Sequence, residues 1–195
     1  MVPRVLRPYI YGVFLFIGGF MRVFVSCSSQ DSIDDLYKEK ASELASLISV
    51  DNDLVFGSSN AGLMGIFYRE FLMNKRHITG ICYELYKDLL DELNLDEVIM
   101  VKSLNESNNE LIKNSDVILV LPGAYGTLSE VISTIELVRT KVYDRKIIFY
   151  NINGFYDDLF KLFDKMYEYG TTKNNYRDIL KVCSTKEDIM KEMMV

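Results

Sequence analysis

The chain has 195 residues, of which 49% are hydrophobic and 26% charged, and it contains 11 glycines and 3 prolines. This composition excludes a fibrous repeat or a low-complexity chain and predicts a single globular domain. Acidic residues outnumber basic residues by 28 to 22, a net charge of -6, and the sequence has no basic stripe, which excludes nucleic acid as the main partner. A local anion site is still compatible with this charge, because backbone N–H groups bind phosphate without a net positive charge.

The cysteines and the histidine limit the chemistry further. Cys27, Cys82 and Cys183 are widely spaced and odd in number, and His77 is the single histidine of the sequence. These counts exclude a zinc site built from cysteine and histidine, so no metal is expected, and they argue against a disulfide scaffold. A reducing, cytoplasmic location is therefore expected. A hydrolytic triad would depend on His77 alone, and its place at the start of a predicted strand favours a structural or surface role.

Residues 1–20 differ from the rest of the chain. Two arginines precede a 12-residue apolar run, Tyr9–Phe20, which is the arrangement of a signal peptide. Arg22 follows closely, and the run is shorter than the roughly 20 apolar residues of an ordinary transmembrane helix, so a membrane is not expected to be a partner. Three interpretations stay open: an extension upstream of an effective start at Met21, a membrane-associating segment, or a segment packed on the domain. The domain itself is expected to span residues 21–195.

From Met21 onward, short β-branched runs alternate with longer amphipathic stretches. Strands are predicted, in chain order, at Arg22–Ser26, Leu54–Phe56, Ile78–Tyr83, Glu97–Val101, Val117–Leu121 and Ile147–Asn151. Helices are predicted between and after them at Ser32–Ser49, Ala61–Asn74, Glu84–Leu93, Glu106–Lys113, Thr127–Val142, Tyr156–Tyr169 and Thr185–Met194. The strands are almost continuously apolar, as strands buried on both faces of a parallel sheet are. The alternation predicts one α/β domain, a Rossmann-like doubly wound parallel sheet flanked by helices.

Ligands of such sheets bind beyond the carboxyl ends of the strands, where three loops are rich in glycine, serine and threonine: residues 26–29, 57–62 and 122–127. In the third loop, Gly123 and Gly126 allow a ligand to approach the backbone. Thr127 can cap the next helix, whose N-terminus supplies free N–H groups for a phosphate. The loop lacks the Gly-Lys-Ser/Thr of a Walker A loop and the G-x-G-x-x-G of a dinucleotide site, and a purely structural turn is the alternative.

Glu130 follows Thr127 by three residues, in the first turn of the predicted helix. A carboxylate beside the sugar of a bound nucleotide can stabilise an oxocarbenium-like transition state or position water, as carboxylates do in glycoside hydrolysis. The same spacing is also typical of a capping box, in which Glu130 would pair with Thr127 and have no catalytic role.

These segments together resemble the Lonely Guy (LOG) family, long mislabelled as lysine decarboxylases, and its P-G-G-x-G-T-x-x-E motif. The similar stretches are VFVSCSS (23–29), VFGSSNAGLMG (55–65), HITGICY (77–83), DVILVLPGAYGTLSE (116–130) and NINGFYDDLFKLFDKMYEYG (151–170). The resemblance implies a Rossmann-like domain, usually a homodimer, that binds a nucleoside 5'-monophosphate and needs no metal or redox cofactor. It implies a phosphoribohydrolase, in which water cleaves the N-glycosidic bond to give a free base and ribose 5-phosphate. The substrates would be cytokinin riboside monophosphates, as in cytokinin biosynthesis, or AMP.

The resemblance also assigns residues to the site. The positions that match the family pattern are Gly123, Ala124, Tyr125, Gly126 and Thr127 around the phosphate, Ser28, Ser29, Gly57 and Gly62 along the nucleotide, and Glu130 as the catalytic carboxylate. Two departures concern glycines. Ala124 replaces the second glycine of P-G-G and is strained if it must adopt a positive φ, and Gly57-Ser58-Ser59 stands where the family has three glycines.

A third departure concerns charge. The family has an Arg-Lys pair in the helix before the fifth strand, and its arginine works with the glutamate, but Ser107 and Asn108 occupy these positions here. A hydroxyl cannot replace the fork of donors of an arginine, and Lys102 is the alternative point charge. Three hypotheses follow: an active LOG-type hydrolase, a nucleotide-binding module or sensor that has lost catalysis, and a nucleoside deoxyribosyltransferase-like enzyme.

Overall fold

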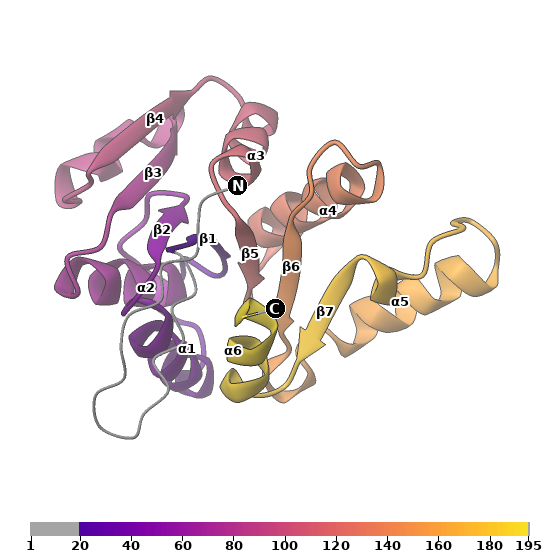
Figure 1. Ribbon diagram of the computed structural model, residues 1–195. Coiled ribbons are helices and arrows are strands. Elements are labelled where there is room, and N and C mark those ends of the chain that lie inside the picture. The colour runs from indigo at the N-terminus through magenta and orange to yellow at the C-terminus, as the bar shows by residue number, and fades with distance from the viewer. Residues whose placement is uncertain (1–19, 195) are drawn as a thin grey trace, which may run out of the picture.

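The computed structural model describes residues 20–194, and within them seven strands form one parallel sheet (Figure 1). The strands are β1 (Arg22–Ser26), β2 (Asp53–Phe56), β3 (Ile78–Tyr83), β4 (Glu97–Val101), β5 (Val117–Val120), β6 (Lys146–Tyr150) and β7 (Leu180–Cys183). Their order in the sheet is β4-β3-β2-β1-β5-β6-β7. The predicted single α/β domain with a doubly wound parallel sheet is confirmed.

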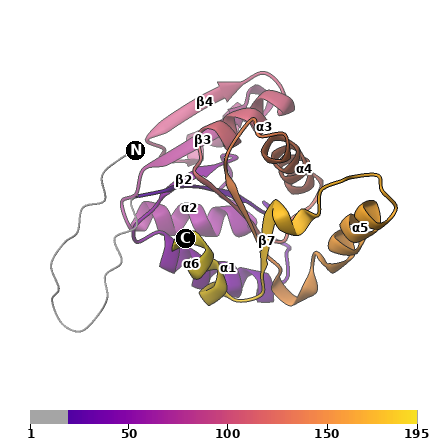
Figure 2. The same ribbon diagram turned by 45° about the vertical axis from the view of Figure 1, so that its right-hand side comes forward.

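Helices cover both faces of the sheet. The α-helices are α1 (Asp35–Ile48), α2 (Gly62–Met73), α3 (Leu104–Lys113), α4 (Tyr125–Arg139), α5 (Asp157–Glu168) and α6 (Lys186–Met194), and three 3₁₀ segments are η1 (Glu84–Glu92), η2 (Ile152–Gly154) and η3 (Tyr176–Asp178). Helices α1, α2 and α6 lie on one face and α3, α4 and α5 on the other (Figure 2). Strand residues alternate between the two cores: Val23 and Val25 lie in the first and Phe24 in the second.

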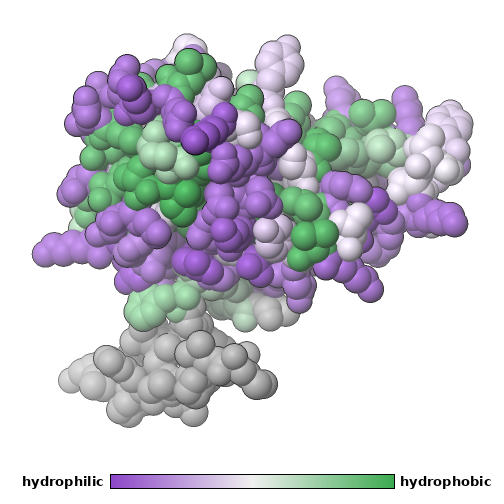
Figure 3. All heavy atoms as spheres, turned by 90° about the horizontal axis from the view of Figure 1, so that it is seen from above, coloured by the Kyte–Doolittle hydropathy of each residue, from purple (hydrophilic) through white to green (hydrophobic). Residues whose placement is uncertain are grey.

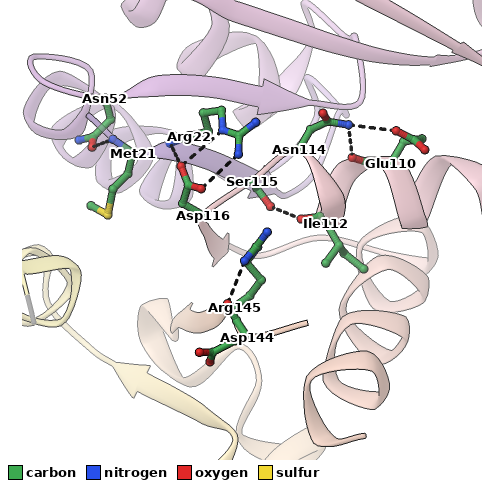
Figure 4. Close-up of polar contacts among 10 residues, drawn as sticks. All are labelled: Met21, Arg22, Asn52, Glu110, Ile112, Asn114, Ser115, Asp116, Asp144 and Arg145. Carbon is green, nitrogen blue, oxygen red and sulfur yellow. Dashed lines mark hydrogen bonds and ion pairs between the residues drawn. The ribbon is translucent and has the colours of Figure 1, made fainter. Parts of the chain in front are cut away.

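β1 lies at the centre of the sheet, where the strand order reverses. It pairs with β2 on one side and with β5 on the other, and Ser26 lies opposite Val120 at the carboxyl end. At the opposite end, the Asp116 carboxylate accepts hydrogen bonds from the Arg22 backbone N–H (2.8 Å) and from Arg22 Nη2 (3.2 Å) (Figure 4). This pairing helps to fix the β1–β5 register, so the segments that follow the two strands emerge side by side at the switch point of the sheet.

Two segments differ from the prediction. The apolar pattern does not predict β7, because Lys181 and Val182 are exposed and the strand lacks the continuous apolar run of the inner strands. Residues 84–92, predicted as an α-helix, form the 3₁₀ segment η1, which is interrupted by the non-helical backbone of Tyr86. η1 leaves the edge strand β4 partly uncovered: Val98 and Met100 are 43% and 42% exposed, and apolar side chains gather over this end of the molecule (Figure 3).

The turn after β2 contains a strained serine. Ser58 has a φ of 57°, in the left-handed region that favours glycine, and its buried hydroxyl donates a hydrogen bond to the Ile81 carbonyl (3.2 Å). The hydroxyl has room because residue 80 is glycine: a Cβ there would lie 2.6 Å from Ser58 Oγ and 2.6 Å from Leu95 Cδ1. The serine that replaces a family glycine at position 58 is therefore accommodated by strand β3.

Of the predicted N-terminal extension, residues 1–20, the structure describes only residue 20. The three interpretations of this extension therefore stay predictions. Among the helices of the described range, none combines the length and the hydropathy of a membrane span. Cys27, Cys82 and Cys183 are all buried free thiols.

Candidate functional site

The loops after β1 and β5 are tied together by backbone hydrogen bonds. The Leu121 N–H donates to the Ser26 carbonyl (3.0 Å), and the Ser28 N–H donates to the Pro122 carbonyl (3.0 Å). The Tyr156 hydroxyl, at the start of α5, donates to the Leu121 carbonyl (2.8 Å). Two of the three predicted loops, residues 26–29 and 122–127, are therefore held against each other at the switch point.

The N-terminus of α4 opens onto this junction. The helix begins at Tyr125, its N-cap residue Ala124 makes no side-chain hydrogen bond, and its first turn has no acidic residue. Its first N–H groups are thus left for an external anion. Gly126 borders open space, since a Cβ there would meet no atom within 4 Å, whereas a Cβ at Gly123 would collide with the Thr127 hydroxyl. This open helix end is compatible with a phosphate site, and the purely structural turn stays the alternative.

Ala124 fits the turn without strain. Its φ is -104°, so the backbone does not need the left-handed conformation that glycine provides. The glycine-to-alanine departure from the P-G-G pattern is therefore tolerated.

The N-terminus of α2, by contrast, is already occupied by protein acceptors. The Asp31 carboxylate accepts a hydrogen bond from the Gly62 N–H (2.8 Å), and the Ser28 carbonyl accepts from Leu63 (2.9 Å) and Met64 (3.2 Å). Gly62 has a φ of 58°, and a Cβ there would lie 2.8 Å from the Ser28 carbonyl oxygen, so this close approach requires glycine. The open helix end at the junction is that of α4.

The remaining predicted residues lie around this junction at different depths. Ser29 is half-buried in the loop after β1, and Gly57 is exposed at the end of β2, the neighbouring strand. Tyr125 is 90% exposed at the start of α4. The structure thus brings residues 26–29 and 122–127 together directly, whereas Gly57 lies at their margin.

Glu130 lies in the second turn of α4, because the helix begins at Tyr125, two residues earlier than predicted. Thr127 is therefore not the N-cap residue, and the capping-box interpretation is wrong. The Glu130 carboxylate instead accepts a hydrogen bond from the Ser26 hydroxyl, with 2.5 Å between Oγ and Oε2. Burial raises the pKa of Glu130 from 4.5 to about 7, and the Ser26 hydrogen bond opposes this rise. A buried carboxyl group with a strongly raised pKa therefore lies at the switch point.

No basic side chain among residues 20–194 hydrogen-bonds to Glu130 or lowers its pKa. Ser107, which the sequence comparison without gaps predicts at the position of the family arginine, is half-buried in α3. The neighbouring Asn108 faces α4, where its amide donates to the hydroxyls of Ser129 (3.3 Å) and Ser133 (3.2 Å). Its role is to join two helices, and the cation of the family pattern is not replaced at these positions.

Lys102 does not supply the charge either. It is exposed and follows the edge strand β4, which lies three strands from β1. Two arginines of the helices next to the junction are paired elsewhere: Arg69 with the Asn60 side chain (2.8 Å) and Arg139 with Glu136 (2.6 Å).

The other titratable side chains near Glu130 stay uncharged. Burial, and to a smaller extent the Glu130 charge, raises the pKa of the Cys27 thiol well above its usual value, and burial raises the pKa of the Tyr156 hydroxyl. Cys27 is therefore not a thiolate nucleophile at neutral pH. His77 is exposed at the start of β3, at the opposite edge of the sheet, in agreement with the predicted surface role. Glu130 is the group at the junction that changes charge near pH 7.

The sequence pattern does not single out Ser26 or Tyr156. Ser26 is recognisable only as the polar last residue of an apolar strand, RVFVS, which is the position that points to the carboxyl edge of a parallel sheet. Tyr156 lies in the segment 151–170 that resembles the LOG family, but its contact with residue 121 depends on the three-dimensional fold.

Comparisons with known proteins identify the family of the chain. The family profile described as "Possible lysine decarboxylase" matches residues 64–193. The chain is 30% identical over 177 residues to the cytokinin riboside 5'-monophosphate phosphoribohydrolase LOG3 of Arabidopsis thaliana, a match that covers 89% of this chain and 82% of that protein. The chain belongs to the LOG family.

Solved structures at lower identity share the fold of this LOG-family chain. The molybdenum cofactor carrier protein of Chlamydomonas reinhardtii has a TM-score of 0.63 at 15% identity, and the match covers 89% of this chain and 96% of that one. The molybdenum cofactor binding protein of Rippkaea orientalis has a TM-score of 0.61 at 17% identity and covers 89% and 98%. These two likenesses concern the fold alone.

Proposed function

We propose that this LOG-family chain hydrolyses the N-glycosidic bond of a nucleoside 5'-monophosphate to a free base and ribose 5-phosphate. One observation carries the proposal: the Glu130 carboxyl group, held by Ser26, lies in the helix whose open N-terminus can bind a phosphate. Gly126 and Glu130 are four residues apart, or roughly 6 Å along the helix axis. This spacing suits a ligand whose phosphate and sugar belong to the same nucleotide.

The helix ends favour a ligand with one phosphate. The first turn of α4 offers backbone N–H groups and the positive end of the helix dipole, with Gly123, Gly126 and Thr127 around them. At α2, the Asp31 carboxylate already occupies the equivalent position and would repel a second phosphate. A monophosphate therefore fits this edge of the sheet better than a diphosphate.

Glu130 acts in this proposal as an ionised carboxylate. As the bond between sugar and base breaks, its electron pair goes to the base and positive charge develops on the sugar ring, where a nearby carboxylate stabilises it. Water then adds to the anomeric carbon and loses a proton, and the base takes up a proton. Because the pKa of Glu130 is about 7, the rate is expected to rise with pH through this value.

The relatives suggest which substrates to test first. The similarity to LOG3 supports cytokinin riboside 5'-monophosphates, and AMP is the second substrate to test. The base would lie beyond the loops of Ser28, Ser29 and Gly57 and beside the exposed Tyr125 ring. Comparing the rates of base release from these two substrates would show which base the site prefers.

A homodimer forms part of the same proposal. A groove of about 470 Å³ between α4 and α5 has an apolar part that includes Ile132, Ile135 and Phe163, and a polar part that includes Glu136 and Arg139; Ile132 is 45% exposed. A second copy of the chain would cover this surface. Sedimentation of the purified protein is expected at twice the mass of the chain, and Ile132→Glu is expected to give the monomer.

The test follows free base by chromatography after incubation of the purified protein with AMP, GMP, CMP, UMP and isopentenyladenosine monophosphate at pH 8. Glu130→Gln is expected to lower the rate by roughly 10²-fold or more, as loss of a catalytic carboxylate does. Glu39→Gln, an exposed glutamate of α1 away from the groove between α4 and α5, is the control and keeps the wild-type rate. Release that is equal in Glu130→Gln and wild type would contradict the proposal, and transfer to an added base in place of water would indicate a deoxyribosyltransferase.

A second candidate function is a nucleotide-binding module or sensor without catalysis. The lack of a basic partner for Glu130 among residues 20–194 favours it, since Ser107 stands where the family has the arginine that works with the glutamate. For a module of this kind, the wild-type protein is expected to release no base in the chromatographic assay. Calorimetry of the same protein is expected to show that it still binds the nucleotide.

A further inference from the structure

Ser26 is the direct hydrogen-bond partner of Glu130. The residue is the last of β1 and is wholly buried, and its Oγ lies 2.5 Å from Glu130 Oε2, although 104 residues separate the two in sequence. The contact exists because β1 and β5 pair in the middle of the sheet, which places the end of β1 under the second turn of α4. No other side chain of residues 20–194 donates a hydrogen bond to this carboxylate.

We propose that Ser26 is a positioning residue for Glu130, taking over part of the role of the basic partner that the site lacks. The hydroxyl holds Oε2 in place, so that Oε1 is the oxygen available to a ligand. A donor within the protein also favours the ionised carboxylate over the neutral acid, as a nearby cation would do more strongly. The consequence for catalysis rests on the proposed function, whereas the consequence for the ionisation of Glu130 does not.

Apart from burial, Ser26 is the group that sets the ionisation of Glu130. The Glu130 charge raises the pKa of Cys27, directly after β1, and of Tyr156, at the start of α5, and both remain protonated at neutral pH. From α3, the nearest polar contact to the same helix turn is the uncharged Asn108. Of the two causes that set the pKa of Glu130, burial raises it and the Ser26 hydrogen bond lowers it.

The experiment titrates Glu130 directly, by NMR of protein labelled with ¹³C at the glutamate carboxyl carbons, with Glu130→Gln to identify the resonance. In Ser26→Ala, the midpoint is expected to rise by about 1–2 pH units, the effect of losing one hydrogen bond to a charged group. Ser26→Cys keeps the volume with a weaker donor and is expected to give an intermediate midpoint, which also serves if the alanine variant does not fold. An unchanged midpoint in these variants overturns the proposal.

Ser115→Ala is the matched control. Ser115 is also a wholly buried serine, and its hydroxyl donates to the Ile112 carbonyl (3.0 Å) at the opposite edge of the sheet (Figure 4). This variant is expected to leave the Glu130 midpoint where it is in the wild type. A shift as large as that of Ser26→Ala would show a general effect of losing a buried hydroxyl and would overturn the assignment to Ser26.

A kinetic measurement separates the two proposals. If the wild type releases base, Ser26→Ala is expected to lower kcat by roughly 10-fold with KM within twofold, and to move the pH–rate profile by the same amount as the NMR midpoint. Ser115→Ala is expected to change neither. If the wild type releases no base, the hydrolase proposal fails, but the NMR midpoints still decide the role of Ser26. If base is released and the Ser26 variants match wild type in both measurements, the role of Ser26 alone is refuted.

Discussion

Replacing Glu130 by glutamine is expected to make the folded chain more stable at alkaline pH. The pKa of this buried carboxyl is raised from 4.5 to about 7, so the folded chain binds a proton that the unfolded chain has already lost between these pH values. Stability from this group is therefore fully present below pH 4.5 and is lost as pH rises through 7. Each pH unit corresponds to 1.36 kcal/mol, so the loss amounts to about 3 kcal/mol.

Glutamine removes this loss because it cannot ionise, and its amide oxygen can still accept the Ser26 hydrogen bond. Urea unfolding followed by circular dichroism, from pH 4.5 to pH 8.5, gives the free energy of unfolding of both proteins. The difference between variant and wild type is expected to grow by about 3 kcal/mol in favour of the variant over this range. Comparing the two proteins at each pH cancels the contributions of all other titrating groups.

The control for this prediction is Glu136→Gln. Arg139 lowers the pKa of Glu136 by a hydrogen bond, so this group contributes stability above its unfolded pKa that is lost as pH falls, the opposite sign to Glu130. Parallel stability curves for Glu130→Gln and wild type between pH 4.5 and pH 8.5 would refute the reasoning, because they would mean that Glu130 titrates as an ordinary surface glutamate.

Three glycine-related changes test the loops. Gly126→Ala is expected to keep the free energy of unfolding, because its methyl group enters only the open space at α4. Nucleoside monophosphate binding, measured by calorimetry, is expected to weaken at least 10-fold. An unchanged affinity would mean that the phosphate does not bind at this helix end. Gly62→Ala is expected to destabilise by roughly 2–5 kcal/mol in urea unfolding, since it combines a positive φ with a backbone clash; a loss below about 1 kcal/mol would argue against this close approach. Ala124→Gly is expected to lower stability by about 0.5–1 kcal/mol, and a gain would show that this turn needs glycine after all.

Local signals explain which elements the sequence predicts. Inner strands such as β5 are continuous apolar runs with every residue buried, and their positions follow from that pattern alone. β7 is an edge strand of four residues with its two central side chains exposed, so its sequence does not differ from that of a loop. Residues 84–92 have the composition of an amphipathic helix, but the short crossover from β3 to β4 folds as 3₁₀ turns with a break at Tyr86.

The candidate site shows the same division between local and distant information. The glycines around the α4 N-terminus and the Glu130 carboxyl belong to one continuous motif, and the sequence suffices to nominate them. The partner of Glu130 does not follow from any spacing, because the Ser26 contact depends on which strand lies beside β5. The start of α4 was also decisive, since moving it by two residues changes Glu130 from a capping residue to a side chain of the second turn.

The contact between Ser58 and residue 80 has a consequence for how this chain can change. The Ser58 hydroxyl occupies the space that any side chain at position 80 would need, so a substitution of Gly80 is tolerated only after residue 58 has lost its hydroxyl. Among relatives of this chain, a serine at 58 is expected to occur with glycine at 80, whereas a small side chain at 80 needs both glycine at 58 and a shift of the Leu95 side chain, whose Cδ1 would lie 2.6 Å from the new Cβ. The two positions form a pair in which the order of mutations matters: residue 58 must lose its hydroxyl before residue 80 gains a side chain, and serine at 58 is excluded once residue 80 has one.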